Sequence, residues 1–295
     1  YGDHRDLHVR SRRQRQMCIR DRLYTIPERA LQLNGHSYFK FTFILFEQKH
    51  MIDINSDMGE LTHLFEDGTY HRMIDHVTSI NLACGGHAGN TIMMTELSKL
   101  AKLKNVRVGA HPGYPDPDNF GRAVMDMDSG GLTQTILEQI RRLGEIVYEE
   151  NEELSHVKPH GALYNQAAKD REISRSIGKA VITFNPNLIM IGLSGSVMLH
   201  VWQDMGLQVI EEAFGDRAYE SDGSLRNRNL DHALIADPKK AAQQAQMITN
   251  EGKVISFDGS DININAQTIC IHSDTPNALD IAKKVNESIN ERSNY

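Results

Sequence analysis

Short apolar runs alternate with longer stretches of helical period along the chain from residue 51 onward. A short apolar run between turn signals indicates a buried strand, whereas apolar residues at every third or fourth position indicate an amphipathic helix. The predicted strands cover residues 51–56, 79–84, 106–110, 156–159, 188–193, 207–211, 254–257 and 268–272. The predicted helices cover residues 91–104, 132–151, 171–183 and 238–250, and a last helix opens at Asp274-Thr-Pro-Asn, with Pro276 in its first turn, and runs through Ile289.

This alternation predicts βαβ units and therefore a parallel sheet. The sequence contains neither a G-x-G-x-x-G motif after the first strand nor a G-x-x-x-x-G-K-[ST] phosphate loop. A closed or nearly closed barrel is therefore favoured over a doubly wound nucleotide-binding sheet. We predict an α/β fold, a (β/α) barrel of seven or eight strands, formed by a single catalytic domain at residues 51–295.

The first 50 residues lack this pattern. They hold ten Lys and Arg against five Asp and Glu, and the segment RSRRQRQMCIRDR resembles translated sequencing-adapter sequence. The apolar run at residues 38–46 is too short to span a bilayer, and EQKH follows it instead of a signal-peptidase site. We therefore expect residues 1–50 to be a non-native or disordered N-terminal extension.

The remainder of the chain is acidic, and the net charge of the whole is -7. An acidic body repels a phosphate backbone, so we expect no nucleic-acid partner, and no apolar run predicts a membrane partner. The 3 cysteines lie far apart without metal-finger or redox spacing, which indicates reduced thiols and a cytoplasmic location. The sequence is also compatible with a homo-oligomer.

Clusters of polar residues and glycines directly follow six of the predicted strands. Each cluster alone could be a capped turn, but in a (β/α) barrel all six meet at the face where active sites are built. We expect catalytic roles for Asp57, His111, Lys158, His160 and Asp216, and substrate or phosphate binding by Asn55, Glu60, His87, Asn90, Tyr164, Asn165, Arg217, Tyr219, His272 and Asp274.

The side-chain chemistry suggests different roles for the residues at this face. Lys158 and Arg217 offer cationic donors to a phosphate or a substrate carboxylate. His160, His111 and Asp57 suit proton transfer near neutral pH. A divalent metal is an alternative, because one carboxylate and two imidazoles form a familiar ligand set, here Asp57, His87 and His111.

Six ordered blocks, from residue 51 to the end of the chain, resemble those of the LamB/YcsF family. They read DINSDMGE, NLACGGHAGN, GAHPGYPDPDNFGR, HVKPHGALYNQAAKD, EAFGDRAYESDGSL and QTICIHSDTPNA. The family is understood as the A subunit of prokaryotic 5-oxoprolinase. The resemblance implies a deformed (β/α) barrel of the glycoside hydrolase/deacetylase type. It also implies ATP-dependent opening of 5-oxo-L-proline to L-glutamate, yielding ADP and phosphate, with partner subunits B and C.

The sequence departs from the family pattern at four places. The family has Asp where Asn90 stands, Gly where Ser273 stands and Pro where Asn227 stands. The segment at residues 61–75 is also longer and more charged than its family counterpart. If the family's carboxylate at the first of these positions binds metal or substrate, the activity of this chain is altered.

Two other functions compete with the one that the resemblance implies. The first is a metal-dependent deacetylase or amidohydrolase on the same barrel, working without ATP. The second is a non-catalytic substrate-binding subunit whose chemistry lies on its partners. Sensitivity to a chelator would indicate the first, and binding without turnover would indicate the second.

Overall fold

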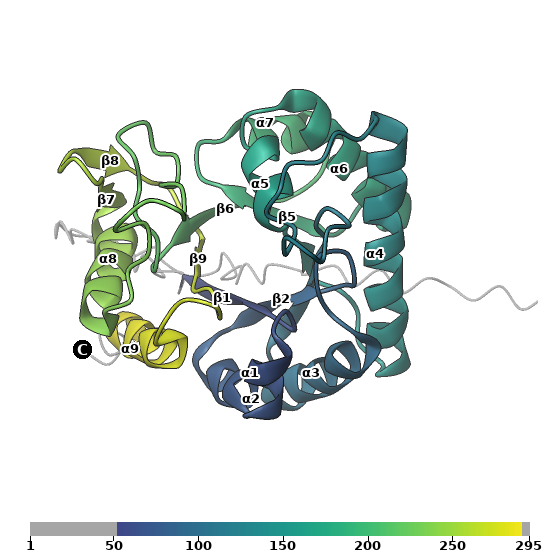
Figure 1. Ribbon diagram of the computed structural model, residues 1–295, viewed down its shortest axis with the longest axis horizontal. Helices are drawn as coiled ribbons and strands as arrows, with labels where there is room; N and C mark the ends of the chain where they lie inside the picture. The colour runs from purple at the N-terminus through teal and green to yellow at the C-terminus, as the bar shows by residue number, and fades with distance from the viewer. Residues whose placement is uncertain (1–51, 291–295) are drawn as a thin grey trace, which may run out of the picture. The chain divides into compact units, whose positions relative to one another are not determined.

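The computed structural model describes residues 52–290, and there a closed barrel of parallel strands lies inside a ring of helices (Figure 1). Neighbouring strands pair in register, for example Asp57 with Asn81 and Glu212 with Thr268. The expected (β/α) barrel is confirmed, with seven strands. In order around the barrel they are β1 (Asp53–Met58), β2 (Ser79–Ala83), β3 (Arg107–His111), β4 (His156–Val157), β5 (Ile189–Leu193), β6 (Val209–Phe214) and β9 (Thr268–Cys270), and β9 pairs with β1 to close the circle.

Several of the longer helices begin at a capping side chain. Asp128, Asp170 and Asp237 each accept hydrogen bonds from backbone N–H groups of the first helical turn. No helix within residues 52–290 is long and apolar enough to cross a membrane. The helices are α1 (Thr62–Glu66), α2 (Thr69–Met73), α3 (Thr91–Lys104), α4 (Ser129–Glu149), α5 (Gly161–Ala167), α6 (Arg171–Phe184), α7 (Val197–Asp204), α8 (Pro238–Glu251) and α9 (Ala278–Asn290), with the short 3-10 helix η1 (Ile74–His76).

One predicted strand was wrong as a barrel strand, and the last helix begins later than predicted. The strand expected at residues 254–257 is not a barrel strand, because β7 (Lys253–Ile255) pairs antiparallel with β8 (Asp261–Asn263) in a separate hairpin. Only a tight turn separates the two strands, whereas a parallel barrel neighbour needs a long crossover. The last helix begins at Ala278, so Pro276 precedes it, because Asn277 adopts a left-handed φ of 64°.

The apolar core lies between the barrel and the helices. Successive strand residues point to opposite faces, so Ile80 and Leu82 of β2 face the helices, while Asn81 between them faces the barrel interior. Trp202 of α7 is fully buried and donates its indole N–H to the Ser174 carbonyl of α6 at 2.9 Å. This packing fixes the positions of the strand ends that carry the site.

The interior of the barrel is polar rather than apolar. The Asn55 amide donates to Glu212 Oε1 at 3.0 Å and to Thr268 Oγ1 at 2.7 Å. The ring of His156 fills the space beside Gly109, where an added Cβ would lie 2.1 Å from its Nε2. Buried polar groups satisfied by one another make a rigid network, so the barrel forms a fixed base under the site.

Candidate active site

A cavity of about 350 Å³ opens at the carboxyl ends of the barrel strands. This volume suits a small-molecule ligand, and active sites of this fold lie at this face. The walls come from the strand ends, from α5 and from the loop at residues 224–229. Polar residues that line it include Asp57, Glu60, His111, Arg122, Lys158, His160, Tyr164, Asn165, Arg217, Arg226, Arg228 and His272.

At the base of the cavity, the Lys158 ammonium group is held between two carboxylates. Its Nζ lies 3.0 Å from Asp57 Oδ1 and 2.8 Å from Glu212 Oε1, and it donates to Cys270 Sγ at 3.0 Å. Burial alone would lower the pKa of Lys158, but these neighbours outweigh burial and raise the pKa well above its usual value. The lysine is therefore a fixed positive charge whose nearby acids already balance it.

Two histidines face each other above this lysine. A carbonyl oxygen can only accept, so His111 Nδ1 donates to the Lys158 carbonyl at 2.7 Å and His160 Nε2 donates to the Phe120 carbonyl at 2.9 Å. The inner nitrogens, His111 Nε2 and His160 Nδ1, then lie 3.0 Å apart and close to Glu60 Oε1. If both rings were neutral, two lone pairs and a carboxylate would converge, so a proton or a cation must sit among them.

The surroundings push the pKa values of these two histidines apart. Burial opposes protonation of His111, but Asp57 and Glu60 outweigh burial and raise the pKa of His111 above its usual value. For His160, burial outweighs the attraction of Glu60 and lowers the pKa. The structure therefore favours a proton on His111 that is donated to neutral His160, with the pKa of Glu60 held well below its usual range.

His87 lies behind this pair and stays neutral. Its ring stacks on His160 with centroids 3.6 Å apart, and its Nε2 lies 3.0 Å from Glu60 Oε1. Burial and the neighbouring His160 lower the pKa of His87 to about 3. His87 Nδ1 is buried without a hydrogen-bond partner among residues 52–290. The ring therefore fixes the orientations of His160 and Glu60.

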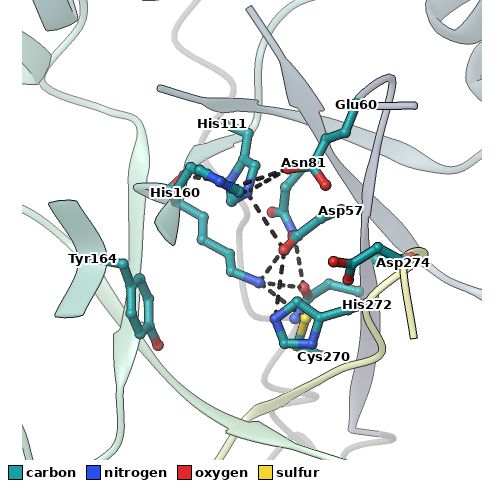
Figure 2. A network of polar contacts seen from close by, with 12 residues as sticks. Asp57, Glu60, Asn81, His111, His160, Tyr164, Cys270, His272 and Asp274 are labelled. Atoms are coloured by element: carbon teal, nitrogen blue, oxygen red, sulfur yellow. Dashed lines mark hydrogen bonds and ion pairs between the residues drawn. The ribbon is translucent and has the colours of Figure 1, made fainter. Parts of the chain in front are cut away.

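A second histidine–carboxylate pair lies on the β9 side of the cavity, where Figure 2 shows His272 pointing toward Asp57. His272 Nδ1 donates to Asp216 Oδ1 at 3.0 Å, and Thr275 donates to Asp216 Oδ2 at 2.5 Å. Burial would raise the pKa of Asp216, but His272 and these hydrogen bonds lower it to about 2. Asp216 therefore positions the His272 ring, which stacks on Phe214.

Charges of opposite character separate the base of the cavity from its opening. We call Asp57, Glu60, His111, Lys158, His160 and Glu212 the floor, because all of them are buried. We call Arg122, Arg217, Arg228 and Asp274 the mouth, because two of its arginines reach solvent. Asp274 pairs with both Arg122 and Arg228, so the mouth holds three guanidinium groups and one carboxylate.

The structure brings most of the residues expected from the sequence to one place. Nine of them line the cavity directly, whereas Asn55, His87, Asp216 and Asp274 contact those nine from behind or beside. Asn90 lies on the surface and caps α3, accepting a hydrogen bond from the Met93 N–H at 2.9 Å. Tyr219 is buried and accepts the Phe214 N–H at 2.8 Å. Neither of these two lines the cavity.

Sequence reasoning missed the carboxylate of Glu212. It is fully buried, pairs with Lys158 and accepts a hydrogen bond from the Tyr164 hydroxyl at 2.8 Å. The available signal was an acidic residue at an inward position of the apolar strand VIEEAF. Arg122 and Arg228 were missed as well, because their loops carry no strand-end pattern.

A metal ion could be held by residues of the floor. The ligand atoms of Glu60, His87, His111 and His160 lie within 4.8 Å of one another, and Asp57 forms a second such group with Cys270 and His272. The outer nitrogens of His111 and His160 already donate to carbonyls, which is the usual arrangement behind metal-binding imidazoles. The donor set suits a divalent transition metal.

Residues 52–294 match the LamB/YcsF family. The protein named as the A subunit of 5-oxoprolinase in Chloroflexus aggregans is 44% identical over 227 residues, covering 77% of this chain and 90% of the relative. The protein of the same name from Halalkalibacterium halodurans is 42% identical over 238 residues, covering 81% and 93%. The crystal structure of the lactam utilization protein from Thermus thermophilus is similar, with a TM-score of 0.76 and 40% identity over 82% of this chain and 97% of that one.

Proposed function

The chain belongs to the LamB/YcsF family, and from that premise we propose that it is the A subunit of an ATP-dependent 5-oxoprolinase. In this role it opens 5-oxo-L-proline to L-glutamate together with subunits B and C. The names of its relatives support the reaction and the multi-subunit assembly. The observation that carries the proposal for this chain is the floor, where two histidines with opposite pKa shifts meet beside a balanced lysine.

Ring opening by hydrolysis makes specific demands on the site. The bond between the carbonyl carbon and the ring nitrogen breaks, a water oxygen adds to that carbon, and the nitrogen gains a proton. One group must therefore accept a proton from water while another donates one. Neighbouring groups whose pKa values are pushed apart suit this pair of tasks. In the resting site His111 Nε2 donates to His160 Nδ1, so His111, with a raised pKa, first gives this proton to the ring nitrogen, and His160 Nδ1, with a lowered pKa, then accepts the proton from water.

The lysine supplies the remaining charge. Once the lactam oxygen has been phosphorylated, it carries negatively charged phosphoryl oxygens, and a preorganised cation stabilises that charge. Lys158 lines the cavity with its Nζ fixed by Asp57 and Glu212. ATP enters the proposal as co-substrate. Its terminal phosphoryl group moves to the lactam oxygen and ADP leaves, which makes the ring carbon electrophilic. Water then adds to that carbon, the bond to nitrogen breaks to leave an acyl phosphate, and a second water releases phosphate and L-glutamate.

The test measures glutamate release from 5-oxo-L-proline by the full chain with cognate B and C subunits, with and without ATP. We expect release only with ATP and both partners. The Lys158→Met and His160→Asn variants should lose roughly a hundredfold or more of the rate. Lys179→Met and His200→Asn change the same residue types at exposed positions and serve as matched controls.

Two results would contradict the proposal. No release in any combination, with folded protein and competent partners, removes the 5-oxoprolinase assignment. Release that is unchanged in both the Lys158→Met and His160→Asn variants leaves the assembly intact but moves the chemistry to the partners. The chain then serves only to bind the substrate.

A metal-dependent amidohydrolase is the second candidate, favoured by the convergence of Glu60 and the inner nitrogens of His111 and His160. A divalent ion held there supplies Lewis-acid polarisation of a carbonyl and a more acidic bound water. Calorimetric titration of the apo chain with Zn²⁺ tests this site. We expect one ion per chain in the wild type and at least tenfold weaker binding in Glu60→Gln. Amide hydrolysis without ATP that a chelator abolishes would favour this candidate, whereas absence of binding removes it.

A further inference from the structure

Arg217 is a buried cation of the cavity that has no ion-pair partner within residues 52–290. The residue is 5% exposed and lines the cavity. Its guanidinium donates only to main-chain carbonyls, from Nε to Ala233 O at 3.3 Å and from Nη2 to Arg226 O at 2.6 Å. No ion pair joins Arg217 to a carboxylate within residues 52–290, although Arg122, Arg226 and Arg228 of the same cavity each have one.

A buried charge without a partner is costly unless something in the cavity completes it. The two carbonyls fix the plane of the guanidinium, and neither of these bonds uses Nη1. A planar, fixed guanidinium with unused N–H groups is the usual receptor for a carboxylate. The position is therefore built for an anionic group of a ligand and not for a structural ion pair.

The other basic residues of the cavity are either paired with carboxylates or, like Lys169, exposed to solvent. Lys158 is balanced by Asp57 and Glu212, and Arg228 is balanced by Asp274. Burial and the neighbouring Arg228 lower the pKa of Arg217 to about 10 and outweigh the opposing attraction of Asp216 and Asp274, neither of which forms an ion pair with Arg217. A monoanionic ligand group bound at Arg217 supplies that ion pair.

We propose that Arg217 binds the carboxylate of the substrate and so selects a lactam that carries a carboxylate. This inference rests on the proposed function for the identity of the lactam ring. It orients the substrate with the carboxylate at the mouth and the ring amide toward the floor, where Lys158 and His111 lie. It leaves Lys158, which lies between Asp57 and Glu212, beside the ring amide instead of the carboxylate.

The test compares two ligands that differ only in charge, 5-oxo-L-proline and its neutral carboxamide, by calorimetry on the full chain without ATP or partners. We expect the wild type to prefer the carboxylate. Arg217→Met should lower the ratio of the two affinities roughly ten- to a hundredfold, as for a lost charge-assisted hydrogen bond, while carboxamide binding holds. Arg217→Gln, which keeps a donor for the Ala233 or Arg226 carbonyl, should lower the ratio as well. Arg175→Met, at an exposed position of α6, is the matched control.

Three results would overturn the inference. The first is an unchanged ratio in both Arg217 variants. The second is an equal loss of carboxylate and carboxamide binding in both, which assigns the residue a structural role. The third is binding of inorganic phosphate that depends on Arg217 while the ratio does not, which assigns the position to a phosphoryl group.

Different results would contradict the proposed carboxylate position of Arg217 and the proposed reaction. If glutamate is never released but the affinity ratio depends on Arg217, the reaction is wrong and the carboxylate position stands. If neither lactam binds, cyclopentanecarboxylate replaces them as the probe. Binding of that probe that is lost in Arg217→Met sustains the carboxylate position, and absence of any carboxylate binding overturns it.

Discussion

The floor and the mouth of the cavity differ in their balance of acidic and basic side chains. In the floor, three carboxylates surround one lysine and two histidines, and each of these groups is hydrogen-bonded or ion-paired. The mouth holds three guanidinium groups and one carboxylate, which pairs with Arg122 and Arg228, and Arg217 has no acidic partner within residues 52–290. The floor is thus arranged to hold a proton or a cation, and the mouth to receive an anion.

This difference separates the residues that we expect to carry the reaction from those that we expect to bind the ligand. Buried and fully paired charges are rigid and costly to disturb, because a lost partner leaves an uncompensated ion in a low dielectric. Partly exposed charges are screened by water and contribute little to stability. Stability and reaction chemistry should therefore depend on the floor, whereas ligand choice should depend on the mouth.

The largest effect is expected from Lys158→Met. Removing the ammonium leaves Asp57 and Glu212 facing each other without a cation, so the free energy of unfolding should fall by about 3–5 kcal/mol. Urea denaturation measures this change. The double variant Lys158→Met/Glu212→Gln removes one of the two stranded charges and should recover part of the loss. No recovery would show that the three groups do not act as one network.

A smaller effect is expected from acid on the second histidine–carboxylate pair. The pKa of Asp216 is lowered from 3.8 to about 2, so its carboxylate stabilises the fold above pH ~4 and loses that contribution as the pH falls toward 2. The contribution is about 2 kcal/mol. Unfolding measured from pH 6 downward should show a shallower loss in Asp216→Asn than in the wild type. Parallel curves would contradict the assignment.

Asn90 lies outside both the floor and the mouth, so its variants should change stability without changing ligand binding. Its side chain caps α3, so Asn90→Ala should lower the free energy of unfolding by about 1 kcal/mol and leave carboxylate binding unchanged. Asn90→Asp restores the residue that the family carries there and keeps the cap, so its stability should match or exceed that of the wild type. A changed ligand affinity in either variant would place this residue in the site after all.

The smallest effect is expected at the mouth, from Arg122→Met. The Arg122 side chain is 38% exposed, and its partner Asp274 keeps the ion pair with Arg228. The expected change in the free energy of unfolding is about 0.5 kcal/mol or less. Thermal unfolding with and without added salt measures it. A loss as large as that of Lys158→Met would erase the distinction between the two regions.

The hydrophobic pattern predicted the fold well because the barrel is built from local periods. Each strand is a short run and each long helix has one apolar face, and both signals are readable without tertiary contacts. The pattern failed at β7, whose apolar residues look like those of a barrel strand. Only the turn after Ile255, which sends the chain back into β8, makes it a hairpin.

The sequence by itself determined which residues reach the strand ends, because the order of strands and the parallel topology place Asp57, His111, Lys158 and His272 at one face. It did not determine which of these side chains form ion pairs or hydrogen bonds with one another. The structure alone decided that Glu212 balances Lys158, that Arg217 has no ion-pair partner within residues 52–290, and that Asn90 caps a helix away from the cavity. The physical reason is that residues far apart in sequence lie close together in space. Pairing depends on atoms 3 Å apart that come from strands up to two hundred residues apart in sequence, and no local pattern records which of them meet.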